Sequence, residues 1–426
     1  QALCAKAPAR LSGSKNAENA VDFCFQWLQQ LRPDSVWLQP TWVPVWERAQ
    51  GKLEYRLAKG VWQNLAFTEL GGSYGTQGEW LQAELVLVES MEALKAMPEH
   101  ALDGKIALLN QAMDPRLINT FAAYGACGAQ RVLGADYASQ KGAKAVLVRS
   151  LSLGHDHHPH TGIMHYKNPP YIPGLALPVQ EAAFLADLLQ QGASLEVRMQ
   201  LSCTPKDSVL SYNVAAQWHG RDLPEEVVLV GGHLDSWDNS QGAHDDGAGV
   251  VHAIETLRLL KTLNLRPRRS VRCVLFMNEE SGARGAQAYA DSARAEAPRG
   301  VSHLAAIESD RGGFSPRGFS FEALGSTAWL GERRLKSWQP LLEPYGLQYL
   351  SAGGSGVDVS KLKPLGTLLL GLVPDPHRYF DVHHTPADNI DAVHPRELCL
   401  GAAAVASMAW LLAEHGLPAP PKPIKE

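Results

Sequence analysis

The segment 227–249 limits the possible folds of this chain more than any other stretch. It reads VVLVGGHLDSWDNSQGAHDDGAG and begins with four apolar residues, as in a strand buried on both faces of a parallel sheet. Beyond residue 249 the apolar residues recur at helical spacing, so Asp245 and Asp246 lie where a helix begins. In an open α/β sheet, ligands bind outside the carboxyl ends of the strands. We therefore expect a functional site at His233, where this strand ends.

The same arrangement recurs in three later parts of the chain. The apolar run RSVRCVLFM is followed by Glu279 and Glu280, LAAIES by Asp310, and TLLLGLV by a loop that contains His384. A solvated side chain or a helix cap explains any one of these residues, but four strand ends that all carry ligand-type residues indicate a common site. Because the carboxyl ends of parallel strands lie at one edge of a sheet, we expect these side chains to converge there.

The composition argues against several classes of partner. A chain of 426 residues suggests two to three domains. The formal net charge is −5, with 39 Lys and Arg against 44 Asp and Glu and no basic stripe, so neither nucleic acid nor an anionic membrane surface is expected as a partner. Residues 401–413 are the most apolar segment. They are fewer than the ~18–20 residues that span a bilayer, and we expect a core helix and no membrane span.

The chain begins at Gln1 and shows no charged segment followed by an apolar one. We expect the mature end of a secreted or periplasmic protein from which a signal peptide has been removed. The six cysteines lie far apart without a C-x-x-C pair, so a thiolate zinc site is not expected. A disulfide that involves Cys4, Cys24, Cys127 or Cys203 is left open.

Residues 72–203 differ from the rest of the chain in the pattern of their expected secondary structure. Short strands and turns alternate there with an amphipathic helix, in the order strand, Gly-Lys turn, strand, helix, strand. This order resembles the protease-associated domain, a small β-rich module that is inserted in several exopeptidases and proteases. We therefore predict an inserted domain at 72–203, within a catalytic domain formed by 1–71 and 204–426.

A loop at 154–168 in the expected insertion holds five of the sixteen histidines, between His155 and His165. Asp156 is the one carboxylate that accompanies them, and their spacing fits no zinc pattern. A polar loop that reaches toward solvent or the cleft is favoured over a second metal site.

The expected donors at the strand ends are two imidazoles and three carboxylates: His233, Asp245, Glu280, Asp310 and His384. This nitrogen and oxygen set suits Zn²⁺, Mn²⁺ or Co²⁺ and is too rich in imidazole for Ca²⁺ or Mg²⁺. One catalytic zinc keeps about three protein ligands and an open position. Five donors therefore fit two metals that share a carboxylate better than they fit one metal.

Five motifs, in chain order, resemble those of the co-catalytic dizinc exopeptidases, which include bacterial leucyl aminopeptidases, glutamate carboxypeptidases and glutaminyl cyclases. They are GGHLDSW, GAHDDGAG, MNEESGARG, ESD and HHT, and they lie between residues 200 and 384. The variants HLDSWD, QGAHDDG and YFDVHHT, together with the insertion, resemble the carboxypeptidase Q group of this family. The resemblance implies an α/β fold in which a mixed, mostly parallel sheet is sandwiched by helices.

The resemblance also implies the activity and the cofactor. It indicates a dizinc metallopeptidase that hydrolyses dipeptides or short peptides with free termini, with two Zn²⁺ per chain for which Co²⁺ or Mn²⁺ can substitute. By the resemblance Asp245 bridges both ions, His233 and Asp310 complete one site, and Glu280 and His384 complete the other.

The remaining acids near these motifs are assigned to proton transfer and to orientation. Glu279 cannot easily point at the same metal as Glu280, and it has the chemistry of a general base that activates a zinc-bound water. Asp235 and Asp388 are expected to orient the two ligand histidines. Asp235 is thereby counted with the catalytic residues.

Three further features are expected around the motifs. The resemblance implies a cis peptide bond between Asp245 and Asp246. His244 stands where the aminopeptidases usually have an acid, and we expect it to face solvent rather than to alter metal affinity. Tyr379 and His383 are the residues considered for oxyanion stabilisation.

Two other functions are weighed against the exopeptidase. A receptor-like homologue without catalysis conflicts with the complete ligand set and Glu279. An acyl transferase of the glutaminyl cyclase type uses similar residues without water, usually with one zinc and no insertion. The side-chain preference of the peptidase and its specificity for the amino or the carboxyl terminus are left open. The oligomeric state is also left open, with a homodimer as one alternative.

Overall fold

The computed structural model describes residues 1–58, 60–154 and 157–418 of the chain. These residues form two compact units. The first unit comprises Gln1–Val43, Val209–Tyr379 and Asp388–Glu426, and the second comprises Pro44–Ser208 and Phe380–Ala387. The short segment Phe380–Ala387 groups with the second unit although both of its neighbours in the chain belong to the first.

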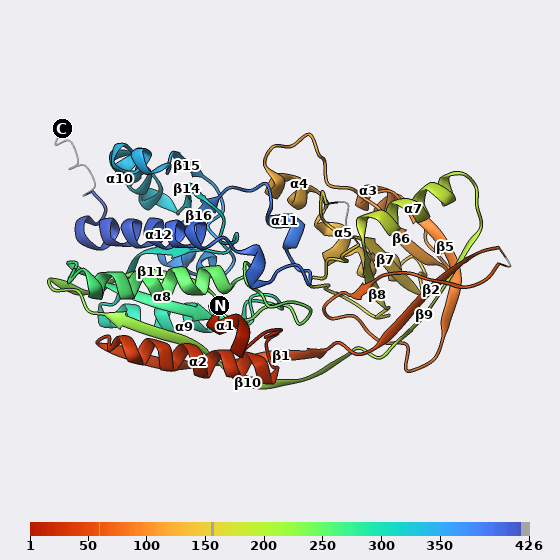
Figure 1. The fold of residues 1–426 in the computed structure, drawn as a ribbon, viewed down its shortest axis with the longest axis horizontal. Helices are drawn as coiled ribbons and strands as arrows, with labels where there is room; N and C mark the ends of the chain where they lie inside the picture. Colours follow the sequence, from red (N-terminus) through yellow and green to blue (C-terminus); the bar gives the residue numbers. More distant parts are fainter. Residues whose placement is uncertain (59, 155–156, 419–426) are drawn as a thin grey trace. The chain divides into compact units, whose positions relative to one another are not determined.

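An eight-stranded mixed sheet dominates the first unit (Figure 1). Its strands, in sheet order, are β1 (Ser35–Glu47), β10 (Thr204–Trp218), β12 (Arg269–Phe276), β11 (Leu223–His233), β13 (Ser302–Glu308), β16 (Leu368–Pro374), β14 (Pro316–Glu322) and β15 (Tyr349–Ala352). The four central strands, β12, β11, β13 and β16, are parallel, whereas β10 pairs antiparallel with β12, and β14 pairs antiparallel with β16 but parallel with β15. The predicted mixed, mostly parallel sheet is confirmed, and its four central strands end at one edge.

Helices cover both faces of this sheet. They are α1 (Ala2–Lys6), α2 (Lys15–Leu31), α8 (Gly247–Thr262), α9 (Arg284–Glu296), α10 (Gly325–Leu342) and α12 (Pro395–His415), with 3₁₀ turns η1 (Ala297–Arg299), η2 (Glu343–Tyr345), η3 (Val359–Leu365) and η4 (Ile390–Ala392). One core joins α2, α8, α10 and α12 to the strand residues Val228 and Val230. The core on the other face joins α9 and η3 to Leu229 and Val274. Because successive side chains of a strand point to opposite faces, the unbroken apolar run of β11 serves both cores.

α12 contains the apolar segment that the sequence assigns to a core helix. Its inner residues Val405, Met408 and Leu412 lie in the core against α8 and the sheet. By length and composition alone it could also cross a membrane, and half of its most apolar stretch is buried in the protein.

The second unit is built on another eight-stranded mixed sheet. Its strands, in sheet order, are β3 (Gln63–Asn64), β2 (Gly51–Leu57), β9 (Leu195–Leu201), β5 (Leu81–Val88), β6 (Ile106–Leu109), β7 (Ala145–Arg149), β8 (Gly174–Leu177) and β4 (Thr68–Glu69). Its helices are α3 (Met91–Ala96), α4 (Thr120–Cys127), α5 (Ala129–Val132), α6 (Gly134–Ser139) and α7 (Val179–Gln190), and the short α11 (Tyr379–Val382) begins at the boundary between the units. β2 precedes residue 72 but pairs along its whole length with β9, so it belongs to this sheet.

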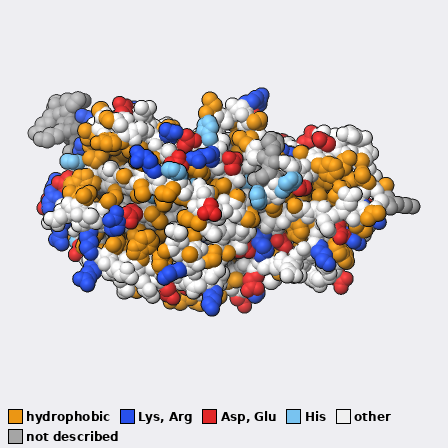
Figure 2. Space-filling view, in the orientation of Figure 1, with side chains coloured by type: hydrophobic (Ala, Val, Ile, Leu, Met, Phe, Trp, Pro, Cys, Tyr) orange, Lys and Arg blue, Asp and Glu red, His pale blue; other side chains and the backbone are white. Residues whose placement is uncertain are grey.

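The surface and the cysteines add two observations. On the face drawn in Figure 2, Lys and Arg side chains are scattered among acidic and apolar ones rather than gathered into one patch. All six cysteines are free thiols, so none of the disulfides left open by the sequence is formed in the structure.

Candidate metal centre

The end of β11 is joined to the start of α8 through one carboxylate, that of Asp246. Its Oδ2 accepts a hydrogen bond from the amide of His233 at 3.0 Å, and its Oδ1 accepts one from the amide of Gly249 at 2.8 Å and caps the helix. Glycine is required at position 232, because a Cβ there would collide with this carboxylate. Asp246 therefore holds its neighbour Asp245 beside the imidazole of His233. The peptide bond between the two aspartates is cis, as the resemblance implied.

Three of the predicted ligands converge at this point. Nε2 of His233 lies 3.0 Å from Oδ1 of Asp245 and 3.4 Å from Oδ1 of Asp310, and one donor atom from each lies within 4.8 Å of the others. Donors around a tetrahedral zinc with bonds of ~2.0–2.1 Å are about 3.3 Å apart. The spacing of this cluster therefore fits a zinc-type ion.

The other nitrogen of His233 has a main-chain partner. Nδ1 lies 3.0 Å from the carbonyl oxygen of Asp235, to which it donates, and 3.7 Å from the carboxylate of that residue. The carbonyl of Asp235 is thus nearer to the imidazole than the carboxylate that the sequence predicts as its partner, and that carboxylate still helps to raise the pKa of His233. Donation from Nδ1 leaves Nε2 as the nitrogen that faces the carboxylates.

The carboxylate of Asp235 instead positions the end of β12. Its Oδ1 accepts from the amides of Asn278 at 2.8 Å and of Glu279 at 3.1 Å. Glu279 and Glu280 follow this strand in the same unit as the cluster, and Glu280 is buried. Asp235 is thus a positioning residue for the segment that carries the predicted general base.

His384 lies in the segment Phe380–Ala387 of the second unit. Its Nδ1 is 3.1 Å from the carbonyl oxygen of Thr161, whose amide donates back to the carbonyl oxygen of His384 at 3.1 Å. Its ring stacks on His383, with ring centres 3.5 Å apart, and His383 in turn contacts Tyr124. The chain in this unit thus fixes the orientation of the imidazole.

Asp388 has a role in the first unit that the sequence did not predict. Both of its oxygens accept main-chain amides of the first unit: Oδ1 those of Ala243 at 3.1 Å and His244 at 2.6 Å, and Oδ2 that of Asp245 at 3.1 Å. Three amides that point the same way attract the carboxylate more strongly than a single imidazole. Burial raises the pKa of Asp388 to about 7, although these hydrogen bonds oppose the shift. Its role is to hold the loop that ends in Asp245.

The expectation that His244 faces solvent is also wrong. The side chain is buried and stacks on Phe314, with ring centres 4.2 Å apart. Its Nδ1 accepts from the amide of Gly313 at 3.0 Å, and its Nε2 lies 3.2 Å from the carbonyl oxygen of Ala392. Both ring nitrogens are used by the main chain, so His244 is a packing residue of this unit.

The electrostatics of the site favour a cation. Burial opposes protonation of His233, but Asp310, Asp235 and Asp245 outweigh it and hold the pKa of the imidazole well above its usual value. Burial raises the pKa of Asp310, and His233 opposes this. Burial likewise raises the pKa of Glu279 well above its usual value; His233 opposes the shift, and several acids add to it. Several anions share a buried site here, and a bound metal ion would relieve their repulsion.

Two buried acids beside the cluster were not singled out from the sequence. Glu308, two residues before Asp310, accepts from the amide of Val359 at 2.7 Å, and Asp358 precedes that residue. Burial, and then the charge of Asp310, raises the pKa of Glu308 to about 7. In the sequence, Glu308 could have been recognised because it is the one charged residue of the otherwise apolar run LAAIES.

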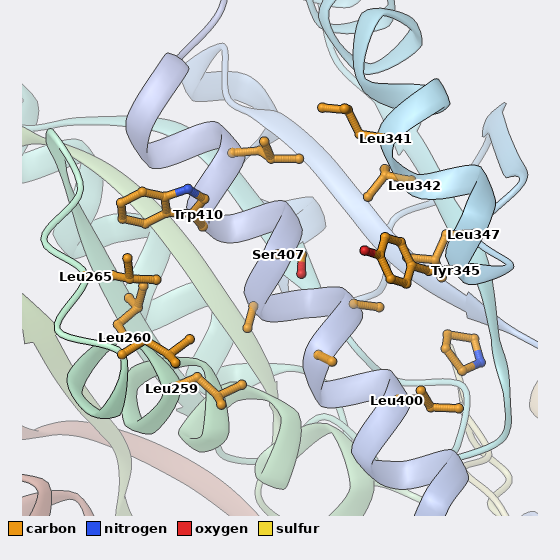
Figure 3. Close-up of a pocket in the computed structure, with 16 residues that line it drawn as sticks. Leu259, Leu260, Leu265, Leu341, Leu342, Tyr345, Leu347, Leu400, Ser407 and Trp410 are labelled. Atoms are coloured by element: carbon orange, nitrogen blue, oxygen red, sulfur yellow. The ribbon is translucent and has the colours of Figure 1, made fainter.

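A large cavity of the first unit lies apart from these acids. It measures about 520 Å³ and is lined by leucines of α8, α10 and α12, with Trp410, Tyr345 and Ser407 (Figure 3). The described residues that line it include no Asp, Glu, His, Lys or Arg. Its lining cannot hold a catalytic metal, and the cluster at the carboxyl ends of the strands remains the candidate site.

The chain is similar to known peptidases in sequence and in structure. Residues 213–409 match Peptidase family M28. Carboxypeptidase Q of Homo sapiens is 33% identical over 410 residues, which cover 95% of this chain and 82% of that protein, and carboxypeptidase Q of Bos taurus is 33% identical over 409 residues.

Two solved structures extend the comparison. The crystal structure of a Peptidase M28 precursor from Shewanella amazonensis SB2B superposes with a TM-score of 0.91 at 32% identity, over 99% of this chain and 94% of that one. An aminopeptidase from Aneurinibacillus sp. strain AM-1 shares the fold, with a TM-score of 0.67 at 21% identity over 97% and 92% of the two chains. With the cluster of His233, Asp245 and Asp310 at its sheet edge, this chain belongs to peptidase family M28 as a metallopeptidase similar to carboxypeptidase Q.

Proposed function

We propose that this protein is a dizinc exopeptidase that hydrolyses dipeptides or short peptides with free termini. The observation that carries the proposal is the convergence of one imidazole nitrogen and two carboxylate oxygens at the carboxyl ends of parallel strands. Nε2 of His233 lies 3.0 Å from Oδ1 of Asp245 and 3.4 Å from Oδ1 of Asp310. Similarity to carboxypeptidase Q over 95% of the chain supports a peptide substrate. Zinc is favoured over Co²⁺ and Mn²⁺ because a zinc aminopeptidase from Bacillus subtilis shares the fold.

Two ions would share Asp245. His233 and Asp310 would hold one of them, which the geometry of the cluster supports. Glu280 and His384 would hold the other, an assignment supported by the resemblance of their motifs and by the suitability of imidazole and carboxylate for zinc.

When bound, the zinc ions polarise the peptide carbonyl and acidify water. Glu279 takes the proton of the attacking water and delivers it to the leaving amine, and its raised pKa suits a group that must accept and return a proton near neutral pH. Asp235 aims Glu279 by accepting its amide hydrogen.

Tyr379 is assigned to the oxyanion. Its phenol is buried in the first unit, and burial followed by the charges of Asp245 and Asp310 raises its pKa well above the usual value. The hydroxyl therefore keeps its proton and can donate it to a developing negative charge.

The proposal extends to the inserted residues, to the location of the protein and to its partners. We propose that residues 72–203 form a separate protease-associated-like insertion, because the ligand-bearing strands all follow it. We further propose that this insertion limits access to short peptides. Export from the cytoplasm is supported by the relative from Shewanella amazonensis, which is described as a precursor. The proposal includes no nucleic-acid partner and no membrane span, and a homodimer is one possible assembly.

A panel of dipeptides tests the function. Purified protein with added zinc should release free amino acids from several dipeptides, and peptides blocked at both ends should resist cleavage. Cyclisation of an amino-terminal glutamine instead of hydrolysis would favour the acyl transferase. No turnover by protein that binds two zinc ions would favour a receptor-like homologue.

A further inference from the structure

Arg10 is fully buried in the first unit, yet it has no ion pair with any acid among the described residues. All three of its hydrogen bonds from the guanidinium go to main-chain carbonyls. Nε donates to Leu234 at 2.6 Å, Nη1 to Gln241 at 2.6 Å and Nη2 to Gly242 at 2.8 Å. Burying a cation costs free energy, because the charge loses its hydration. The planar guanidinium of Arg10 offsets this cost with hydrogen bonds to three carbonyls only if the three carbonyls are held in one fixed arrangement.

The three carbonyls belong to the loop that links two predicted ligands. The loop begins one residue after His233 and ends before Asp245. Main-chain contacts continue the connection, because the amide of Ala9 donates to the carbonyl of Ser240 at 2.8 Å and the amide of Ser236 to the carbonyl of Arg10 at 3.3 Å. The guanidinium therefore fixes the path of this loop between its two ligands.

The fit of the loop around the guanidinium is close. Gly242 has a φ of +57°, and a Cβ there would lie 2.8 Å from Nη1 of Arg10. The carbonyl of Gly242 also accepts the amide of Gly247, at 3.0 Å, in the first turn of α8. One carbonyl thus joins Arg10 to the helix that starts beside Asp245.

The same N-terminal segment reaches the second ligand-bearing loop. Two residues after Arg10, Oγ of Ser12 accepts from Nδ2 of Asn278 at 2.6 Å. Asn278 is buried, precedes Glu279, and has a φ of +74°. Residues 9–12 therefore contact both the loop between His233 and Asp245 and the segment that carries the predicted base.

Arg10 and Asp388 hold the first loop in complementary ways. The guanidinium binds carbonyls at 234, 241 and 242, and the carboxylate binds amides at 243, 244 and 245. We propose that Arg10 is a positioning residue of the metal centre, which sets the separation of His233 and Asp245 and thereby the affinity for the first zinc ion. This inference rests on the proposed zinc site.

The test is the zinc affinity of chelator-treated, full-length protein, measured by competition with a chromophoric chelator. Arg10→Met removes the charge and the three hydrogen bonds. Arg10→Lys keeps the charge but cannot bind three carbonyls at once. Both variants should bind zinc about 10–100-fold more weakly than the unaltered protein at the site of His233 and Asp245, the range typical of residues that orient metal ligands.

Arg272→Met is the matched control. Arg272 is a second buried arginine of the same unit, which donates to Gln217 at 2.6 Å and to Tyr289 at 2.9 Å, earlier along the strands. Its loss should destabilise the unit but leave zinc affinity within about twofold, which separates a positioning role from general destabilisation.

Unchanged zinc affinity in either folded Arg10 variant would overturn the inference, and so would an equal loss in Arg272→Met. If Arg10→Met does not fold, Arg10→Lys decides the question. Failure of the unaltered protein to bind zinc would instead overturn the proposed function, so the two failures are distinguishable.

Discussion

The carboxyl ends of β11 and β13 carry a buried cluster of one imidazole and several acids. A second buried cluster, on β10, β12, α9 and the start of β13, instead pairs its donors with acceptors. We call the second cluster the Arg272 network; it consists of Gln217, Arg272, Tyr289 and His303. Arg272 donates to Tyr289 at 2.9 Å, and the hydroxyl of Tyr289 lies 2.8 Å from Nε2 of His303. His303 pairs with Val227 of β11, six residues before His233, a separation of roughly 20 Å.

The difference between the clusters separates stability from function. In the Arg272 network the guanidinium donates to Gln217 and Tyr289, and the hydroxyl of Tyr289 pairs with His303, so the network stabilises the fold as it stands. At the sheet edge, Asp245, Asp310 and the nearby glutamates concentrate negative charge around His233. Burial raises the pKa values of Asp310 and Glu279, and the acids hold the pKa of His233 well above its usual value. A fold tolerates such a site where a metal ion completes it.

The largest expected effect concerns two adjacent residues of the sheet edge. Glu279→Gln keeps the shape of the side chain but removes the base, so turnover should fall by on the order of 10²–10⁴ while both zinc ions and substrate binding are retained. Glu280→Gln should instead weaken one zinc site, with activity partly recovered by excess zinc. Metal stoichiometry and kcat for each variant check this, and zinc loss in Glu279→Gln but not in Glu280→Gln would exchange the two roles.

A smaller effect is expected from the Arg272 network. Arg272→Leu leaves Gln217 and Tyr289 buried without their donor, and the free energy of unfolding should fall by about 2–4 kcal/mol. Urea denaturation of metal-free protein measures the change. Zinc content should stay the same, and a marked loss of zinc would show that the two clusters are not independent.

The smallest effect is a change in pH dependence. Burial, followed by the nearby Arg272 charge, lowers the pKa of His303 to about 3. Below about pH 6.5 the unfolded chain binds a proton at this residue that the folded protein excludes, so stability is present above pH 6.5 and is lost as the pH falls toward 3. Well below pH 6.5, each pH unit costs about 1.4 kcal/mol from this group. His303→Gln should flatten the stability curve by about 1 kcal/mol between pH 6.5 and 5.5, where the unfolded imidazole is only partly protonated at the start, and an unaltered slope would contradict the assignment.

The sequence predicts those elements and site residues that depend on local sequence patterns. β11 and α2 follow from an unbroken apolar run and from helical spacing, and α2 has the predicted bounds Lys15–Leu31. The convergence of His233, Asp245 and Asp310 follows from the rule that parallel strands end at one edge.

The sequence does not predict contacts between distant main-chain groups. Asp388 accepts three amides 143–145 residues away, and Arg10 binds carbonyls more than 220 residues away. His244 is buried by its stacking on Phe314. No local sequence pattern predicts these partners, because they depend on how separate loops pack against one another.

The most direct test of the metal site is the zinc content of purified protein, followed with dipeptide hydrolysis through removal and return of the metal. We expect close to two zinc ions per chain, loss of activity as a chelator removes them, and recovery when zinc, Co²⁺ or Mn²⁺ is added. Full activity in protein shown to be metal-free would contradict the account.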